Sequence, residues 1–269
     1  MMRSFTPYVL TGLFGLGLVG GVTLARAEEI VPIVDAATGQ LYGAAAGGNW
    51  VAAADAQELV TQTLTFRAYS KDGHYLRNTT LEPDKGHETC STPTFDSVQT
   101  LPNDAVTLVG ASWNAAPRRP DALDPSSPVY RDALSQWLQE QQINDAQPDV
   151  KELWRVDLEG DRRDEVLIVA SRHRGSATST EAGDYSVLLL RKLVDESVLT
   201  VPIKSQLFPQ ACTAECALEK QEVIGILDLN GDGRMEIIVR SSGYESTTQA
   251  IYTIDGTDIK KRLEWFCGA

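Results

Sequence analysis

Histidine, and the catalytic motifs built on it, are scarce in this sequence. Only three histidines occur in 269 residues, His74, His87 and His173, and no two have a spacing typical of metal ligands. The zinc-protease pattern H-E-x-x-H, the phosphate-binding pattern G-x-x-x-x-G-K-[ST] and the redox pattern C-x-x-C are absent. The sequence therefore indicates no zinc site, no P-loop and no thiol redox centre.

Nucleophile motifs are also missing. "GASWN" around Ser112 comes nearest to G-x-S-x-G, but it ends in Asn114. His87 and Cys90 in "GHETC" could form a base and thiol pair, although we expect Cys90 in a disulfide. Paired catalytic carboxylates leave no sequence motif, so a secreted glycan-directed hydrolase with structural calcium is the alternative to a non-catalytic protein.

Long apolar runs are limited to one, from Val9 to Leu24. Arg3 precedes it and Ala25-Arg26-Ala27 follows it, so we expect residues 1–27 to be a signal peptide cleaved after Ala27. A retained membrane anchor is the alternative, but the run is short for a ~30 Å hydrocarbon core and contains five glycines. We expect a secreted or periplasmic protein that has no membrane partner once the signal is removed.

Positive charge is in deficit. The chain has 24 Lys and Arg against 37 Asp and Glu. Without Arg3 and Arg26 the count is 24 − 2 = 22 basic against 37 acidic side chains, a net charge of −15. Nucleic acid and anionic lipid need a basic surface, so neither is expected as a partner, whereas a protein or glycan partner is compatible with this charge.

Cysteines number four: Cys90, Cys212, Cys216 and Cys267. Export would place them where disulfides persist, and four cysteines allow two bridges in three possible pairings. Our first choice joins Cys212 to Cys216 across "CTAEC" and Cys90 to Cys267 over a long span. The other pairings stay open.

Strand patterns dominate the rest of the chain. Residues 63–70 and 105–113 read as strands, 49–60 as a short helix, and 127–143 as an amphipathic helix with Ser127 as N-cap. Its stripe of Tyr130, Leu134, Trp137 and Leu138 indicates packing on a sheet. The proline-rich segment 116–128 suggests a boundary between an N-terminal α+β part, 28–125, and a C-terminal part, 126–269.

Two C-terminal segments repeat each other. Residues 153–172 align without gaps with residues 224–243, and 184–193 and 249–256 supply a further strand in each copy. This spacing predicts two β units, 151–221 and 222–269. In each copy an apolar strand runs into an acidic loop and the loop leads into a second apolar strand.

The acidic loop of the second copy reads "DLNGDGRMEIIV". Asp228, Asn230 and Asp232 occupy its first, third and fifth positions, Gly233 the sixth, and Glu236 the ninth. This spacing turns several oxygens inward, as a hard cation such as calcium requires. An EF-hand would need Glu at the twelfth position and a following helix, whereas Val239 and "EIIVR" stand here, so we expect the loop between two strands.

This D-x-[DN]-x-D-G-x-x-[DE] pattern resembles the calcium loop of FG-GAP repeats, the blades of integrin-type β-propellers. The resemblance implies calcium ligation by Asp228, Asn230, Asp232, the backbone carbonyl of Arg234, and Glu236. Together with "GASWNA", two such loops and the C-terminal "CGA", the chain is also similar to a family of secreted bacterial proteins, which implies export and no particular activity.

The loop of the first copy departs from this pattern. Asp157, Glu159, Asp161 and Glu165 match the first, third, fifth and ninth positions, but Arg162 replaces the glycine at the sixth. A side chain there must accept positive φ, at a cost on the order of 1 kcal/mol, or distort the loop. We expect calcium in the second loop before the first. The alternative for both loops is a polar hairpin whose carboxylates are solvated or paired with Arg162, Arg163 and Arg234.

The fold expected is mainly β (α+β), with twisted antiparallel sheets, two blade-like units and one amphipathic helix packed on them. A complete propeller needs about four to eight blades, so two units do not predict one. Loops 171–176 and 241–246 would lie on the same rim of the two units. They could form a polar ligand surface or be ordinary solvated loops. The side chains of this surface would be Arg172, His173, Arg174, Tyr244 and Glu245. The function expected is that of an exported non-catalytic calcium-binding module.

Overall fold

The structure is a computed structural model of the chain, and it describes residues 29–268 except 61, 91 and 144–146. The expected signal peptide, residues 1–27, lies outside the described residues. Within the described part of the chain, no helix is both long enough and apolar enough to cross a membrane.

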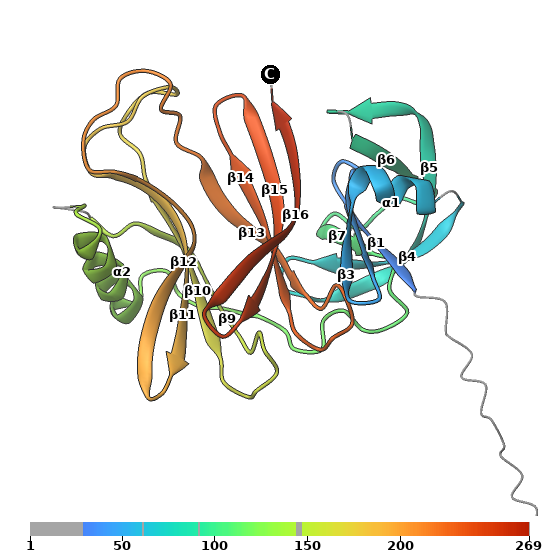
Figure 1. Ribbon diagram of the computed structural model, residues 1–269, viewed down its shortest axis with the longest axis horizontal. Coiled ribbons are helices and arrows are strands. Elements are labelled where there is room, and N and C mark those ends of the chain that lie inside the picture. Colours follow the sequence, from blue (N-terminus) through green and yellow to red (C-terminus); the bar gives the residue numbers. More distant parts are fainter. Residues whose placement is uncertain (1–28, 61, 91, 144–146, 269) are drawn as a thin grey trace, which may run out of the picture.

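The N-terminal part forms one seven-stranded antiparallel sheet with a short helix beside it (Figure 1). Its elements are β1 Ile30–Asp35, β2 Leu41–Ala46, β3 Asn49–Ala52, α1 Ala53–Leu59, β4 Leu64–Ser70, β5 Tyr75–Thr89, β6 Thr92–Ser97 and β7 Ala105–Val109. The strand order is β3-β2-β1-β7-β4-β5-β6. Val34, Phe66 and Leu108 belong to its own buried cluster, so this first sheet has a core of its own.

The C-terminal part forms two further sheets. The second sheet has β8 Asp121–Ala122, β9 Val150–Val156, β10 Glu165–Arg172, β11 Asp184–Val194 and β12 Ser197–Phe208, with α2 Pro128–Glu140 on its outer face. The third sheet has β13 Lys220–Leu227, β14 Glu236–Ser242, β15 Ser246–Asp255 and β16 Asp258–Gly268. Strands β9 to β12 and β13 to β16 each pair in chain order as an antiparallel meander of four strands.

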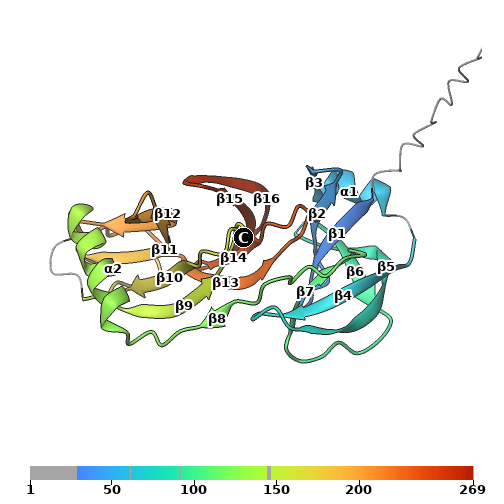
Figure 2. The same cartoon turned by 90° about the horizontal axis from the view of Figure 1, so that it is seen from below.

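The three sheets are stacked with the third in the middle (Figures 1 and 2). Alternation along β14 explains this position, because successive side chains of a strand point to opposite faces. Ile237 and Val239 join a buried cluster with the second sheet, whereas Ile238 joins a cluster with the first sheet. Each central strand is therefore apolar on both faces.

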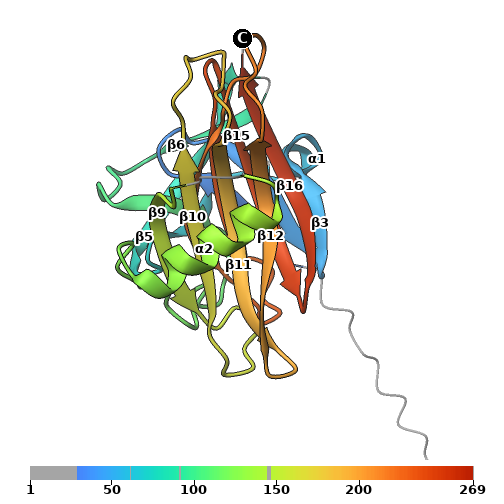
Figure 3. The ribbon, with the colours of Figure 1, turned by 90° about the vertical axis from the view of Figure 1, so that its left-hand side faces the viewer.

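The mainly β fold class and the packed amphipathic helix are confirmed. Leu134, Trp137 and Leu138 of α2 are buried against the outer face of the second sheet (Figure 3). Ser127 is the N-cap residue, although its side chain makes no capping hydrogen bond. Among the described residues the sheets curl but close into neither a barrel nor a propeller, in agreement with the sequence.

Three element boundaries differ from the sequence prediction. Residues 49–52 form β3, so the expected helix begins only at Ala53. The strand expected over 105–113 ends at Val109, although the amide of Gly110 still donates to the carbonyl of Pro32 in β1. The segment 116–128 is not only a linker, since β8 within it pairs with β9.

Both disulfides expected as first choice are present. Cys212 and Cys216 are bonded to each other, and Cys90 is bonded to Cys267, 177 residues further along the chain. Cys90 is therefore no free thiol, which excludes its pairing with His87 as a nucleophile. The long bridge joins the first sheet to β16 of the third, and two disulfides agree with an exported protein.

Candidate functional site

The two acidic loops connect equivalent strands and share one backbone conformation. Loop 1, residues 157–164, joins β9 to β10, and loop 2, residues 228–235, joins β13 to β14. Positive φ occurs at the fourth and sixth positions of both, at Gly160 (77°) and Arg162 (69°) in loop 1 and at Gly231 (76°) and Gly233 (84°) in loop 2. Arg162 thus accepts the left-handed conformation that glycine adopts without cost.

The first carboxylate of each loop caps backbone amides. Asp157 accepts hydrogen bonds from the amides of Gly160 and Arg162 at 2.6 and 3.0 Å. Asp228 accepts from Gly231 and Gly233 at 2.7 and 3.1 Å. These bonds close the turn around the two positive-φ residues, which explains why both loops need an acid at this position.

The ninth position is also used identically in both loops. Glu165 accepts the amide of Leu158 at 2.9 Å, and Glu236 accepts the amide of Leu229 at 2.8 Å. Both glutamates are almost fully buried, 2% and 1% exposed. Each therefore ties the start of β10 or β14 to the beginning of its own loop.

The fifth position of each loop, Asp161 or Asp232, faces solvent. Asp161 accepts the amide of Arg163, Asn230 that of Asp232, and Asp232 that of Arg234, at 2.8 to 3.0 Å. Across the described residues, no three acidic, histidine or cysteine side chains are gathered in an arrangement ready for a metal ion. The oxygens expected to bind calcium are thus in the expected loop but are not assembled as a closed ligand shell.

Among the ion pairs of the described residues, none joins Arg162, Arg163 or Arg234 to a carboxylate of the loops, which was the alternative expected. Arg234 pairs with Asp255 on the neighbouring hairpin at 2.8 Å and not with an acid of loop 2. The loop carboxylates instead accept backbone amides, which are closer in the chain and already oriented by the turn.

A buried lysine distinguishes loop 1. Lys192 of β11 is 6% exposed, and its ammonium group contacts the carboxylate of Glu159 and lies 3.8 Å from that of Glu165. The other oxygen of Glu159 accepts the amide of Gly256, in the β15–β16 hairpin, at 2.6 Å. Glu159 therefore joins loop 1 to the third sheet through a cation and a backbone donor.

Loop 2 has no such cation. In the second sheet Val166 pairs with Arg191, so the preceding residue, Glu165, lies opposite Lys192. In the third sheet Ile237 pairs with Tyr252, so Glu236 lies opposite Thr253. Among the described residues, no basic side chain forms an ion pair with Glu236. The equivalent buried carboxylate of loop 2 is left without a positive partner.

The pKa values of the two buried glutamates reflect the presence of Lys192 beside loop 1. Burial raises the pKa of Glu165 to about 6, against the lowering effects of the Leu158 amide and Lys192. Burial raises the pKa of Glu236 to about 8, with only backbone amides to oppose it and with Asp232 and Asp228 adding repulsion. Burial also raises the pKa of Asp228. Loop 2 therefore holds negative charge at greater cost than loop 1.

A segment missed by the sequence analysis covers both loops. The indole of Trp113 lies against Gly231 and donates to the carbonyl of Asp228 at 3.0 Å. Arg118 donates to the carbonyl of Asp157 in loop 1 at 2.6 Å and to that of Gly233 in loop 2 at 2.7 Å. "GASWNAAPRR" had been considered as a failed nucleophile motif and a linker, and no local pattern reveals contacts made 39 to 115 residues away.

The expected rim surface is partly used for loop structure. Asp184, which is fully buried, accepts the backbone amide and the guanidinium of Arg174, and the ring of His173 contacts the carbonyl of Ser179 at 3.0 Å. Tyr244 is 58% exposed on the β14–β15 turn. Arg174 and His173 therefore hold their own loop in place.

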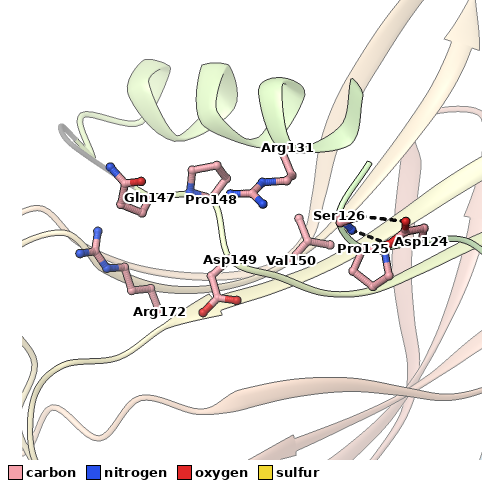
Figure 4. Close-up of a pocket in the computed structure, with 9 residues that line it drawn as sticks. All are labelled: Asp124, Pro125, Ser126, Arg131, Gln147, Pro148, Asp149, Val150 and Arg172. Carbon is pink, nitrogen blue, oxygen red and sulfur yellow. Dashed lines mark hydrogen bonds between the residues drawn. The ribbon is translucent and has the colours of Figure 1, made fainter. Parts of the chain in front are cut away.

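A neighbouring hollow of about 570 Å³ lies between α2 and the segment that enters β9 (Figure 4). Arg131 and Arg172 line it, but Figure 4 shows that their guanidinium groups do not converge on one point. Asp124, at its other end, accepts hydrogen bonds from Ser126. The side chains shown in Figure 4 therefore do not converge on a common position for a ligand.

Comparison of the chain with protein-family models, with curated proteins and with solved structures gives no match. The resemblance to FG-GAP repeats stays a prediction drawn from the loops.

Proposed function

We propose that this chain is an exported, non-catalytic binding or structural module and that loop 2 takes up a calcium ion. The observation that carries the proposal is the buried carboxylate of Glu236, which has a neighbouring buried acid and no cation among the described residues. Burying an ionised carboxylate without a counter-charge is costly, and a divalent cation is the partner with the largest local charge.

Loop 2 offers the kind of donor that calcium prefers. Asp228 is 5% exposed and lies at the start of the turn, while Asn230 and Asp232 extend into solvent from the same turn. Their oxygens now accept single backbone amides or one another's amide group. Rotation of these short side chains towards an ion, with Glu236 and the carbonyl of Arg234, would give an oxygen-rich shell with room for water.

The third sheet gives such an ion a structural role. Trp113 and Arg118 attach loop 2 to the first sheet and to loop 1. An ion in loop 2 would therefore stabilise the junction of all three sheets. A protein or glycan partner would then be bound by a scaffold whose rigidity depends on extracellular calcium.

The test is the melting temperature of residues 28–269 in chelator and in millimolar calcium. A site with Kd of ~10 μM would gain roughly 2.7 kcal/mol, which is an increase of about 5–10 °C for a chain of this size. Asp232→Asn, an exposed substitution, should remove the increase, and Asp228→Ala should remove it with some loss of basal stability.

Asp161→Asn in loop 1 is the matched control and should keep the full calcium response, because Lys192 of β11 already supplies a positive charge to loop 1. An equal melting temperature in chelator and calcium would refute calcium uptake, and an increase that survives Asp232→Asn would place the ion elsewhere.

A further inference from the structure

A second pocket lies on the outer face of the second sheet, between the C-terminal half of α2 and the β11–β12 hairpin. Figure 3 shows α2 lying across these strands. The volume of the pocket is about 320 Å³. Trp137 of α2 and Val198 of β12 supply its apolar side chains. Val198 is 56% exposed, so its side chain is accessible at the mouth.

Arg191 supplies the charge of this pocket. The side chain is half-buried, and its Nη1 donates to the hydroxyl of Thr200 at 3.0 Å. Among the described residues, no carboxylate lies within 4.0 Å of its guanidinium group. Desolvation by partial burial lowers the pKa of Arg191.

Glu140, the acid that lines this pocket, forms no ion pair with Arg191 in the described part of the chain. Glu140 lines the same pocket but is exposed, and its carboxylate accepts a hydrogen bond from Gln136 at 3.0 Å. Other basic side chains withdrawn from solvent do have carboxylate partners: Lys192 contacts Glu159, and Arg240 contacts Asp35. Arg191 differs from them in facing an open pocket.

We propose that this pocket binds a small organic monocarboxylate through Arg191, with the apolar group of the ligand against Trp137 and Val198. A guanidinium group presents two parallel N–H donors that match a carboxylate, and the partial burial of Arg191 beside Trp137 strengthens this charge-assisted pair. A dianion is disfavoured by Glu140 at the rim and by the acidic surface of the whole chain. This site is independent of calcium in loop 2.

The carboxylate can belong to a free aromatic or aliphatic acid or to the C-terminus of a peptide. Calorimetric titration with 3-phenylpropionate tests the first source, and titration with N-acetyl-glycyl-phenylalanine tests the second. We expect dissociation constants of about 1 mM for these small probes. The uncharged counterparts, 3-phenylpropanol and the peptide amide, should bind at least tenfold more weakly.

Arg191→Gln keeps the polar contact with Thr200 but removes the charge, and should weaken binding of both acids by about tenfold to a hundredfold. Arg131→Gln, in the first turn of α2 and in the separate hollow of Figure 4, is the control and should bind like the unmodified chain. Nitrogen-edited NMR should show shifts at the Arg191 Nε–H and the Trp137 indole.

Equal binding of acid and alcohol, equal binding by Arg191→Gln, or no binding of either acid at ~20 mM would overturn the proposal. Tighter binding of the peptide acid would assign the natural ligand to a peptide end, and tighter binding of phenylpropionate to a free acid. Both of these results require Arg191 and support the site.

Discussion

Loops 1 and 2 have the same turn, the same capping aspartate and the same buried glutamate, yet they compensate negative charge differently. Lys192 lies beside Glu159 and Glu165 in loop 1, whereas Thr253 is the register equivalent beside Glu236 in loop 2. Lys192 of β11 therefore supplies a cation to loop 1, whereas among the described residues no basic side chain pairs with Glu236 of loop 2. Similar backbones do not imply similar ligand binding, because the neighbouring strand that pairs with β10 or β14 decides the local charge.

The largest expected effect comes from making loop 1 resemble loop 2. Lys192→Thr leaves Glu159 and Glu165 without their cation, and the loss of one partner of a buried ion pair costs about 3–5 kcal/mol. Chemical denaturation in chelator should show this loss. In millimolar calcium part of the stability should return, because loop 1 would then lack its internal cation.

Lys192→Arg, which keeps the charge, is the matched control and should show a smaller loss and no calcium response in loop 1. If Lys192→Thr were as stable as the unmodified chain in chelator, the contrast between the loops would have no energetic basis.

The next effect concerns pH in the absence of metal. The pKa of Glu236 in the folded chain, about 8, is above its ordinary value of 4.5. The contribution of protonated Glu236 to the free energy of unfolding is therefore present at low pH and is lost as pH rises from about 4.5 through 8. Glu236→Gln cannot ionise, so in chelator at pH 8 it should be more stable by on the order of a few kcal/mol.

Glu165→Gln is the comparison. The pKa of Glu165 is raised only to about 6, and the substitution removes a partner of Lys192, so we expect little gain or a net loss. The measurement is the free energy of unfolding at pH 5 and pH 8 for both variants. A pH slope that is unchanged in Glu236→Gln would show that another group controls it.

The smallest effect is conformational and is expected at the sixth position of each loop. Gly233→Arg introduces a side chain at a φ of 84°, and a Cβ there would meet no atom within 4 Å, so the cost is backbone strain of about 1 kcal/mol. Arg162→Gly relieves the same strain in loop 1 and should stabilise by a few tenths of a kcal/mol. Thermal unfolding of the two variants in chelator should move in opposite directions.

Local sequence patterns predicted the loops and most of their strands. The fixed spacing from Asp228 to Glu236, the glycine at the sixth position and the apolar strands on either side are all contained within a short segment. For Arg162 the same spacing left two outcomes, positive φ or a distorted loop, and Arg162 adopts positive φ. Such features are predictable because their causes lie within one turn of the chain.

The contacts that distinguish the loops were not predicted. Lys192 reaches Glu159 only because β11 pairs with β10 in one register, and Arg118 reaches Gly233 only because the sheets stack. Strands β12 and β16 were also missed, since each is an edge strand with frequent polar residues and one exposed face. Sheet register and stacking are properties of the whole chain that short periodic patterns do not contain.

The disulfide between Cys90 and Cys267 closes a covalent ring through strands of all three sheets. Peptide-bond cleavage at any single place between these two residues leaves both fragments attached to each other. An extracellular protease that nicks one exposed loop in this span would not release a piece of the protein. Separation would require reduction of this bridge or a second cut.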